Sequence, residues 1–315
     1  MENKVFCLGV IVGDFLGKPV ESIPEKGKLA LTDRVELHIG GCATNTGIVL
    51  SRLGVNVSIS GKVGDDNLGR FVINKLKEEA RIDVSKIKIS KNKNTSGTIV
   101  LIHADGERSF IHSIGANSDL HLEDIDFEYM KTFPLIHIAG ALLMHGFDGK
   151  PLAETLKRAK KMGLITCLDT AWDATGRWLE LIEDALPYTD YFLPSIEEAR
   201  MITKKKTPED IAKFLMDKGV KNVGLKMGGD GSYICNEKES FRFPALDFNV
   251  VDTTGCGDAY VAGFIAGLVK EFSFEKCGML ANLVGAKAAT AIGATAGIIS
   301  YEDTLEFGKK YGYNF

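Results

Sequence analysis

Residues 252–264 read DTTGCGDAYVAGF, a loop of small residues that leads into an apolar helix running to about Val269. At the start of such a helix, free backbone N–H groups and the positive end of the helix dipole attract an anion. Gly255 and Gly257 allow the backbone to come close to that anion, for example a phosphate. Asp258 lies in the first turn, and its carboxylate would repel an anion bound beside it. This arrangement makes sense if Asp258 acts on the other reactant, by accepting a proton from an attacking hydroxyl. Taken alone, the pattern also fits a capped helix after a tight turn.

Glycine is abundant throughout the chain. The 315 residues include 34 glycines but only 8 prolines, whereas glycine usage in proteins is typically roughly 7%. This excess indicates many places where the backbone turns tightly or approaches a ligand. The spacing of Gly9, Gly13 and Gly17 fits neither a GxGxxG fingerprint nor a GxxxxGK phosphate loop, and neither HExxH nor GxSxG occurs.

Strand-like and helix-like segments alternate along the chain. Short apolar runs predict buried strands at residues 5–12, 57–60, 135–139, 164–168, 191–193 and 223–226. Amphipathic patterns between them predict helices at residues 71–79 and 152–162. A third helix is bounded by Thr207 as N-cap, Pro208 at the first position and Gly219 after the last turn. This order predicts an α/β fold with a mainly parallel central sheet flanked by helices.

Two segments depart from this order, because polar and apolar residues alternate in them as in half-exposed strands. They are residues 15–39 and 96–113, and Asp105-Gly106 in the second is a strong hairpin signal. We interpret both as inserts in a single domain spanning residues 1–315. They form either a small β lid over a pocket or hairpins at the edge of the main sheet.

Composition and charge exclude several classes of protein. Apolar residues make up 45% and charged residues 25% of the chain, so it is neither disordered nor fibrous. The net charge of −4 argues against a nucleic-acid partner, and the three lysines at 204–206 indicate a solvated loop. The six cysteines contain no CxxC pair, which favours reduced thiols and argues against a zinc or redox motif. Without a membrane span or signal peptide pattern, we expect a cytoplasmic protein with no membrane partner.

The stretch at 252–264 resembles the C-terminal signature of the ribokinase (PfkB) family of carbohydrate kinases. Residues 40–45, GGCATN, followed by Gly54 and Gly64, are similar to the N-terminal signature of that family, and the resemblance covers about residues 4–300. It implies a ribokinase-like fold. The chain departs from the family at two positions: Gly47 stands where Ser, Thr or Ala is usual, and Cys256 replaces a smaller residue in the anion-binding loop.

The resemblance implies catalytic roles for the residues of the C-terminal motif. Asp258 would be the general base that deprotonates the substrate hydroxyl. The backbone N–H groups of Gly255, Cys256 and Gly257 would form an anion hole for the γ-phosphate of ATP.

The resemblance also implies a sugar-binding site. Asp14, near the end of the first predicted strand, would accept hydrogen bonds from sugar hydroxyls, as an ionised carboxylate can. Gly40, Gly41 and Asn45 would complete this site. Read from the residues alone, Asp14 could equally cap a turn and Asn45 could simply begin a helix.

A third group of residues would bind the nucleotide and Mg²⁺. The NxxE motif of the family is only partly present, with Ser195 in place of Asn and Glu198 at the glutamate position. Glu198 would organise Mg²⁺ through water, although it could also be an exposed helix residue. The glycine-containing turn at 226–231 would lie beside the nucleotide, although an ordinary hairpin turn explains it equally well. The nucleotide contacts implied by the resemblance are Ser195, Lys226, Gly228, Gly231 and Asn282.

A monovalent-cation loop is the last feature that the resemblance implies. It would be formed by Gly293 and Gly297 of the segment 293–297, by Asp252 and by the carbonyl of Thr254. A bound K⁺ would order the anion hole.

Together these features predict an ATP- and Mg²⁺-dependent kinase that phosphorylates a hydroxyl of a sugar or sugar-like molecule, with a lid that excludes water. One alternative is a nucleoside kinase of the same family, in which Phe15, Phe110 and His112 of the lid could contact a base. These side chains could equally be lid core. A second alternative is a non-catalytic regulator that binds a sugar or nucleotide. The family also suggests a homodimer formed through the lid.

Overall fold

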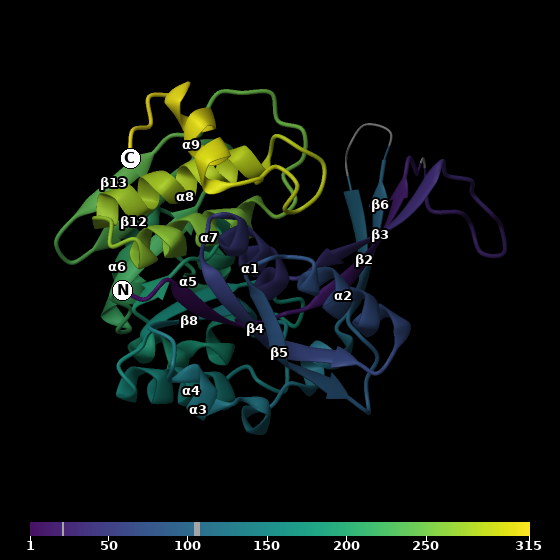
Figure 1. Ribbon diagram of the computed structural model, residues 1–315, viewed down its shortest axis with the longest axis horizontal. Helices are drawn as coiled ribbons and strands as arrows, with labels where there is room; N and C mark the ends of the chain where they lie inside the picture. The colour runs from purple at the N-terminus through teal and green to yellow at the C-terminus, as the bar shows by residue number, and fades with distance from the viewer. Residues whose placement is uncertain (21, 104–107) are drawn as a thin grey trace.

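The computed structural model describes residues 1–20, 22–103 and 108–315. Within them the chain forms two sheets flanked by helices, which confirms the expected α/β class (Figure 1). The larger sheet has nine strands in the order β13-β12-β11-β10-β9-β8-β1-β4-β5. Its strands are β1 (Lys4–Gly9), β4 (Asn56–Gly64), β5 (Ile82–Ser90), β8 (Leu135–Ala141), β9 (Ile165–Thr170), β10 (Tyr191–Phe192), β11 (Asn222–Lys226), β12 (Ser232–Asn236) and β13 (Ser240–Phe243).

The larger sheet is mainly parallel, as the sequence predicts. The strands from β5 to β11 in this order pair in parallel, and β12 and β13 add an antiparallel edge. Nine helices cover it in the described residues. They are α1 (Cys42–Arg52), α2 (Asn67–Lys77), α3 (Phe127–Met130), α4 (Lys150–Lys161), α5 (Ile196–Thr203), α6 (Pro208–Asp217), α7 (Cys256–Val269), α8 (Phe274–Ala288) and α9 (Tyr301–Lys309).

Each face of the sheet has its own hydrophobic core. Helices α3 to α6 pack on one face, and α1, α2, α7, α8 and α9 pack on the other. Strand β1 shows how one strand serves both cores: Phe6 and Leu8 belong to the first, and Val5 and Cys7 belong to the second. Side chains that alternate along a strand point to opposite faces, so a strand buried on both sides is apolar throughout.

Several local predictions are confirmed. Thr207 caps α6 by accepting a hydrogen bond from the backbone N–H of Asp210, Pro208 is the first helical residue, and the three lysines at 204–206 are exposed between helices. The two other predicted helices correspond to α2 and α4. Apart from these predictions, none of the helices in the described ranges combines the length and the hydropathy of a membrane span.

The prediction of one strand over residues 5–12 is wrong. Strand β1 ends at Gly9, and β2 (Val12–Lys18) begins in the other sheet. The backbone changes partners between them: Val10 N–H donates to the carbonyl of Ala139 in β8, and Gly13 N–H donates to Ser96. An apolar run cannot reveal such a change, because both segments are hydrophobic.

The two unusual segments form a separate four-stranded sheet rather than edge hairpins; we call this sheet the lid. Its order is β3-β2-β6-β7, with β3 (Arg34–Gly40), β6 (Gly97–Ile102) and β7 (Arg108–Ser113). It projects from the body of the molecule at the right of Figure 1. The predicted Asp105-Gly106 turn lies outside the described residues.

The lid has two different faces, because side chains alternate along each strand. One face carries four polar residues that pair across the strands. This inner row consists of His38, Asp14, Thr98 and His112. The opposite face carries an apolar outer row, which consists of Leu37, Phe15, Ile99 and Ile111 and whose side chains are 37–54% exposed.

Candidate active site

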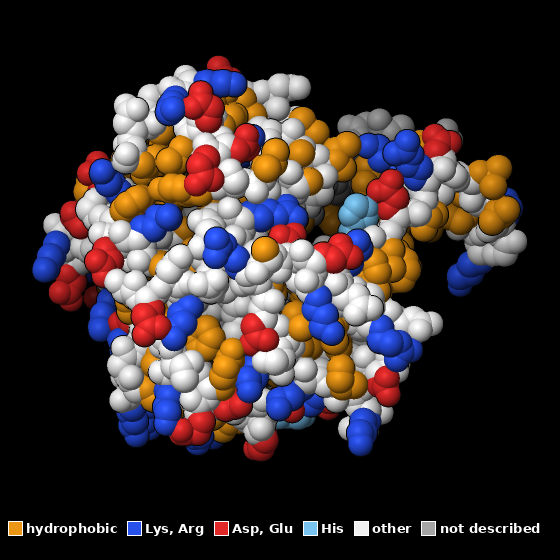
Figure 2. All heavy atoms as spheres, viewed as in Figure 1, with side chains coloured by type: hydrophobic (Ala, Val, Ile, Leu, Met, Phe, Trp, Pro, Cys, Tyr) orange, Lys and Arg blue, Asp and Glu red, His pale blue; other side chains and the backbone are white. Residues whose placement is uncertain are grey.

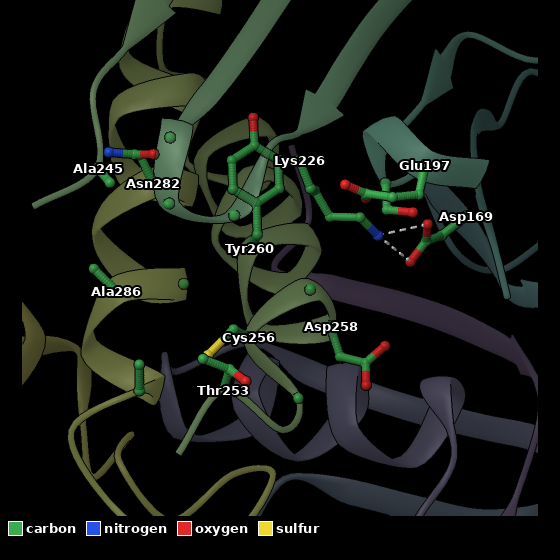
Figure 3. Close-up of a pocket in the computed structure, with 18 of the residues that line it drawn as sticks. Asp169, Glu197, Lys226, Ala245, Thr253, Cys256, Asp258, Tyr260, Asn282 and Ala286 are labelled. Carbon is green, nitrogen blue, oxygen red and sulfur yellow. Dashed lines mark hydrogen bonds and ion pairs between the residues drawn. The ribbon is translucent and has the colours of Figure 1, made fainter. Parts of the chain in front are cut away.

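A cavity of about 710 Å³ lies at the carboxyl ends of the parallel strands, where ligands bind in open α/β sheets (Figure 3). Strands β9 and β11 end in it, and the start of α7 forms part of its wall. Ten residues predicted from the sequence gather there. They are Ser195, Glu198, Lys226, Gly228, Gly231, Gly255, Cys256, Gly257, Asp258 and Asn282.

The cavity brings the N-terminal and C-terminal motifs together. Asn45, in the first turn of α1, donates from its amide to a carboxylate oxygen of Asp258 at 2.8 Å. The other amide atom of Asn45, Oδ1, is buried and has no hydrogen-bond partner within the described residues. Burial raises the pKa of Asp258 above its usual value, although the hydrogen bond from Asn45 opposes this. The site therefore holds the Asp258 carboxylate, which can take up a proton, beside Asn45 Oδ1, which can accept a hydrogen bond.

The loop before α7 has the geometry expected of an anion-binding turn. Gly255 caps the helix with φ +73°, and a Cβ at this position would overlap the carbonyl of Ala294. The N–H of Cys256 already donates to the carbonyl of Thr253 at 3.3 Å, so this predicted donor is engaged within the turn. The N–H groups of Gly257 and Asp258 belong to the first turn of α7, where no intrahelical acceptor exists.

A buried ion pair stands beside this loop. The ammonium of Lys226, at the end of β11, donates to both carboxylate oxygens of Asp169, at 2.7 and 2.8 Å, as the dashed lines in Figure 3 show. A Cβ on Gly257 would lie 3.6 Å from the Lys226 nitrogen, so the charge adjoins the anion-binding loop. Burial favours a lower pKa for Lys226, but Asp169, Glu198 and Asp258 together hold it above its ordinary value. Burial also raises the pKa of Asp169, against the effect of Lys226.

Ser195 and Glu198 form a capping box at the start of α5. The Ser195 hydroxyl accepts from the Glu198 N–H at 3.2 Å, and Glu198 accepts from the Ser195 N–H at 3.0 Å. The hydroxyl of Thr170 donates to the same glutamate oxygen at 3.1 Å. Glu198 is thus a partly buried carboxylate in the cavity wall, not an exposed helix residue, and Ser195 serves the helix end.

The opposite end of the cavity has an apolar wall that sequence reasoning missed. It is formed by Ala245, Leu246, Phe248, Val250, Ala286 and Ala289. The turn at 228–230 is a hairpin turn between β11 and β12 and also lines the cavity. Asn282 lies in the wall, but its amide is already used: Oδ1 accepts from Ser232, and Nδ2 donates to the carbonyl of Pro244.

The predicted sugar-site residues lie beside the cavity rather than in its wall. Asp14 stands on the inner row of the lid, and a Cβ on Gly40 would overlap its carboxylate, so a larger residue at this position would displace the Asp14 side chain. Gly41 caps α1, whose first residue, Cys42, does line the cavity. Burial raises the pKa of Asp14, against a hydrogen bond from Thr98.

The residues of the predicted cation loop are brought together only in part. The Asp252 carboxylate accepts from the N–H of Thr254 at 2.7 Å and from that of Gly293 at 2.8 Å. Asp252 therefore ties the anion-binding turn to the segment 293–297. Gly297 instead packs against the backbone of α8. Within the described residues, no cluster of three or more His, Cys, Asp or Glu side chains could hold a metal.

The aromatic residues near the site have different positions. Phe15 belongs to the outer row of the lid and cannot act with Phe110 and His112, which lie on the other face. Trp172, which sequence reasoning missed, lines the cavity with 55% of its surface exposed and packs edge-on against Trp178 at 4.9 Å.

The chain is similar to known proteins over most of its length. A model of the family described as pfkB family carbohydrate kinase matches residues 2–300. An ATP-dependent 6-phosphofructokinase of Thermoanaerobacterium thermosaccharolyticum is 30% identical over 269 residues, which cover 83% of this chain and 82% of the relative. A 2-dehydro-3-deoxygluconokinase of Bacillus subtilis is 27% identical over 293 residues, 90% of each chain. The crystal structure of a putative ribokinase II from E. coli with ATP and Mg²⁺ has a TM-score of 0.86 at 23% identity, covering 98% of this chain and 99% of that one.

Proposed function

Because the chain belongs to the pfkB family of carbohydrate kinases, we propose that its cavity transfers the γ-phosphoryl group of ATP to a hydroxyl of a sugar or sugar-like acceptor, with Asp258 as general base. The proposal treats residues 1–315 as one kinase domain with the lid inserted. One observation carries it: a hydrogen bond of 2.8 Å joins the N-terminal motif, through Asn45 beside the cavity, to Asp258 in the cavity wall.

The proposed step is a single displacement. Asp258 takes the proton of the acceptor hydroxyl, the hydroxyl oxygen bonds to the γ-phosphorus, and the bond from that phosphorus to the β–γ bridging oxygen breaks to release ADP. A raised pKa makes Asp258 a stronger base than an exposed aspartate. Asn45 fixes one oxygen of this carboxylate, and its free Oδ1 can accept from a second hydroxyl of the acceptor.

The charge of the transferring group would be stabilised from two sides. The N–H groups at the start of α7 face it from the anion-binding loop, and the Lys226 ammonium adjoins that loop. Asp169 is a positioning residue in this scheme, because it holds Lys226 through two hydrogen bonds. Such preorganised donors act strongly in a buried site.

The nucleotide would lie with its base against the apolar wall of the cavity and its phosphates toward the start of α7, beside Lys226, Gly228 and Gly231. Glu198 fits a role in holding Mg²⁺ through water, because it is a partly buried carboxylate in the cavity and Mg²⁺ keeps several waters. When bound, Mg²⁺ supplies positive charge to the phosphates. For K⁺, Asp252 would act indirectly by holding the loop that offers carbonyl ligands, since two backbone N–H groups already occupy its carboxylate.

A homodimer through the outer faces of two lids is part of the proposal. The four outer-row residues form a continuous apolar strip, and Figure 2 shows apolar side chains on the projecting lid. Exposed apolar strips of this kind mark interaction surfaces. A cytoplasmic location also fits, since all six cysteines are free thiols.

A nucleoside kinase is the second candidate, and one observation favours it. Phe110 lies on the same face of the lid as Asp14 and is 61% exposed, as an aromatic group that stacks on a base would be. Purified protein assayed for ADP release with a sugar panel and a nucleoside panel separates the two functions. Ligand binding without phosphoryl transfer to any member would instead reveal a non-catalytic binding protein.

A further inference from the structure

The inner face of the lid carries little positive charge near the acceptor site. The inner row contains one carboxylate and two histidines. The next row on the same face, two residues along each strand, consists of Glu36, Leu16, Val100 and Phe110. The nearest row on this face with a Lys or Arg side chain is the one that pairs Lys18 with Arg34, four residues beyond Asp14.

The polar groups of the inner row are neutral or already engaged. The ring of His38 is 2.9 Å from Glu36, and His112 is 3.1 Å from the hydroxyl of Thr98. Partial burial lowers the pKa of His112, which favours the uncharged ring. The row therefore offers hydrogen-bond donors and acceptors, with Asp14 as its charged member.

Among the residues that line the described cavity, Lys226 is the single Lys or Arg. Asp258 adds a second carboxylate, and the charge of Lys226 is held by Asp169. Trp172 supplies an aromatic surface in the cavity wall. An acceptor with its own phosphate or carboxylate would face two carboxylates here without a compensating cation, which is unfavourable at short range.

We propose that the acceptor is an uncharged ring compound, a sugar or nucleoside without phosphate or carboxylate, selected by the inner row of the lid. This inference rests on the proposed kinase function and narrows its substrate class. Acceptor hydroxyls donate to Asp14 and exchange hydrogen bonds with Thr98 and His112. The apolar face of the ring packs on Phe110 or Trp172.

The test is a panel of neutral aldoses, ketoses and nucleosides, each assayed beside its phosphorylated or carboxylate counterpart, for example fructose with fructose 6-phosphate and inosine with inosine 5′-monophosphate. ADP release gives kcat/KM. Each accepted neutral compound should exceed its anionic counterpart by about 100-fold, as expected from an uncompensated charge at a desolvated site. An anion used as well as its neutral counterpart overturns the proposal.

Tryptophan fluorescence reports binding independently of turnover. Trp172 is exposed in the cavity and Trp178 is buried, so an acceptor that contacts Trp172 should change the emission. Neutral members that change it without being phosphorylated would contradict the kinase function but support the inferred ligand class. If no neutral member is either bound or phosphorylated, the inference is wrong.

A charge placed on the inner row sharpens the test. His112→Lys should raise the preference for a phosphorylated acceptor over its neutral counterpart by about tenfold, because it adds the missing cation. Ser113→Lys is the matched control: the same charge on the next residue of β7 points to the opposite face and should leave the preference unchanged. Gel filtration would check that both variants keep the oligomeric state of the parent. Equal effects of the two lysines would contradict the inner-row assignment.

Discussion

The cavity in the body and the face of the lid differ in how firmly their polar groups are held. In the body, Asn45 donates to Asp258 at 2.8 Å, and Lys226 donates to Asp169 at 2.7 and 2.8 Å. Asn45 and Asp169 are buried, and Asp258 and Lys226 are half-buried. On the lid, the inner row belongs to a four-stranded sheet that stands apart from the main sheet, and its outer face is exposed. Chemistry on a phosphate needs fixed charges in a dry site, whereas selection of an acceptor needs a surface that can close over it.

This contrast predicts two kinetic signatures. Changes in the body should lower kcat and leave the affinity for the acceptor nearly unchanged. Changes on the lid should alter KM for the acceptor or the assembly of the protein.

Asp258→Asn should reduce kcat by about 1000-fold, because it removes the general base while keeping the shape of the side chain. The affinity for ATP, measured by calorimetry, should stay within about twofold of the parent. Asp217→Asn, at the exposed end of α6, is the matched control and should have the parent activity. Near-normal turnover by Asp258→Asn would rule out its assignment as the base.

Lys226→Met should lower kcat by about 100-fold, through loss of a preorganised charge beside the anion-binding loop. It also leaves the buried Asp169 without its partner, which should lower the free energy of unfolding, measured in urea, by about 3–5 kcal/mol. The double variant Asp169→Leu/Lys226→Met should recover much of that stability but none of the activity. Recovery of both would show that the ion pair is structural alone.

The pH profile tests the buried carboxylate of Asp258. Because burial raises its pKa, the acid limb of kcat/KM should have a midpoint above about pH 4, the value for an exposed aspartate. The free energy of unfolding depends on pH in the opposite direction. The folded protein binds this proton more tightly than the unfolded chain does. Asp258 therefore stabilises the fold at low pH, and this stabilisation is lost as the pH rises through the raised pKa. An acid limb at the ordinary aspartate value would contradict the assignment.

Phe15→Glu should have the smallest effect on catalysis and a large one on assembly. A charge in the outer row should convert the proposed homodimer to monomer in light scattering, while kcat changes by no more than about threefold. Met162→Glu replaces an apolar side chain of 37% exposure at the end of α4 and should leave the assembly intact. A parent protein that is already monomeric would exclude the lid dimer.

Much of the fold could be predicted from the sequence because helix caps and apolar runs depend on residues that are neighbours in the chain. The Thr207–Pro208 cap and the apolar runs of β8 to β11 depend on neighbouring residues, and the structure confirms them. The break between β1 and β2 could not be predicted, since it depends on which distant strand accepts each N–H. The separation of the lid from the main sheet is likewise a long-range property.

The site divides in the same way. Gly255, Gly257 and Asp258 lie within four consecutive residues, so their shared position could be inferred from spacing. Asp169 was missed because it directly follows the apolar run at 164–168, and its role depends on an ion pair with Lys226, 57 positions away in the sequence. A carboxylate at the carboxyl end of a buried strand was the available signal. Phe15 was grouped with Phe110 because the face of a lid residue depends on the pairing register.

Product analysis of one reaction, with ATP and a neutral sugar or nucleoside that the panel identifies, distinguishes phosphorylation of the acceptor from hydrolysis of ATP. Mass spectrometry should find one phosphorylated acceptor for each ADP formed, with neither product formed by Asp258→Asn above background. ADP without phosphorylated acceptor, or equal amounts of product from Asp258→Asn, would contradict an acceptor-hydroxyl kinase that works through this cavity.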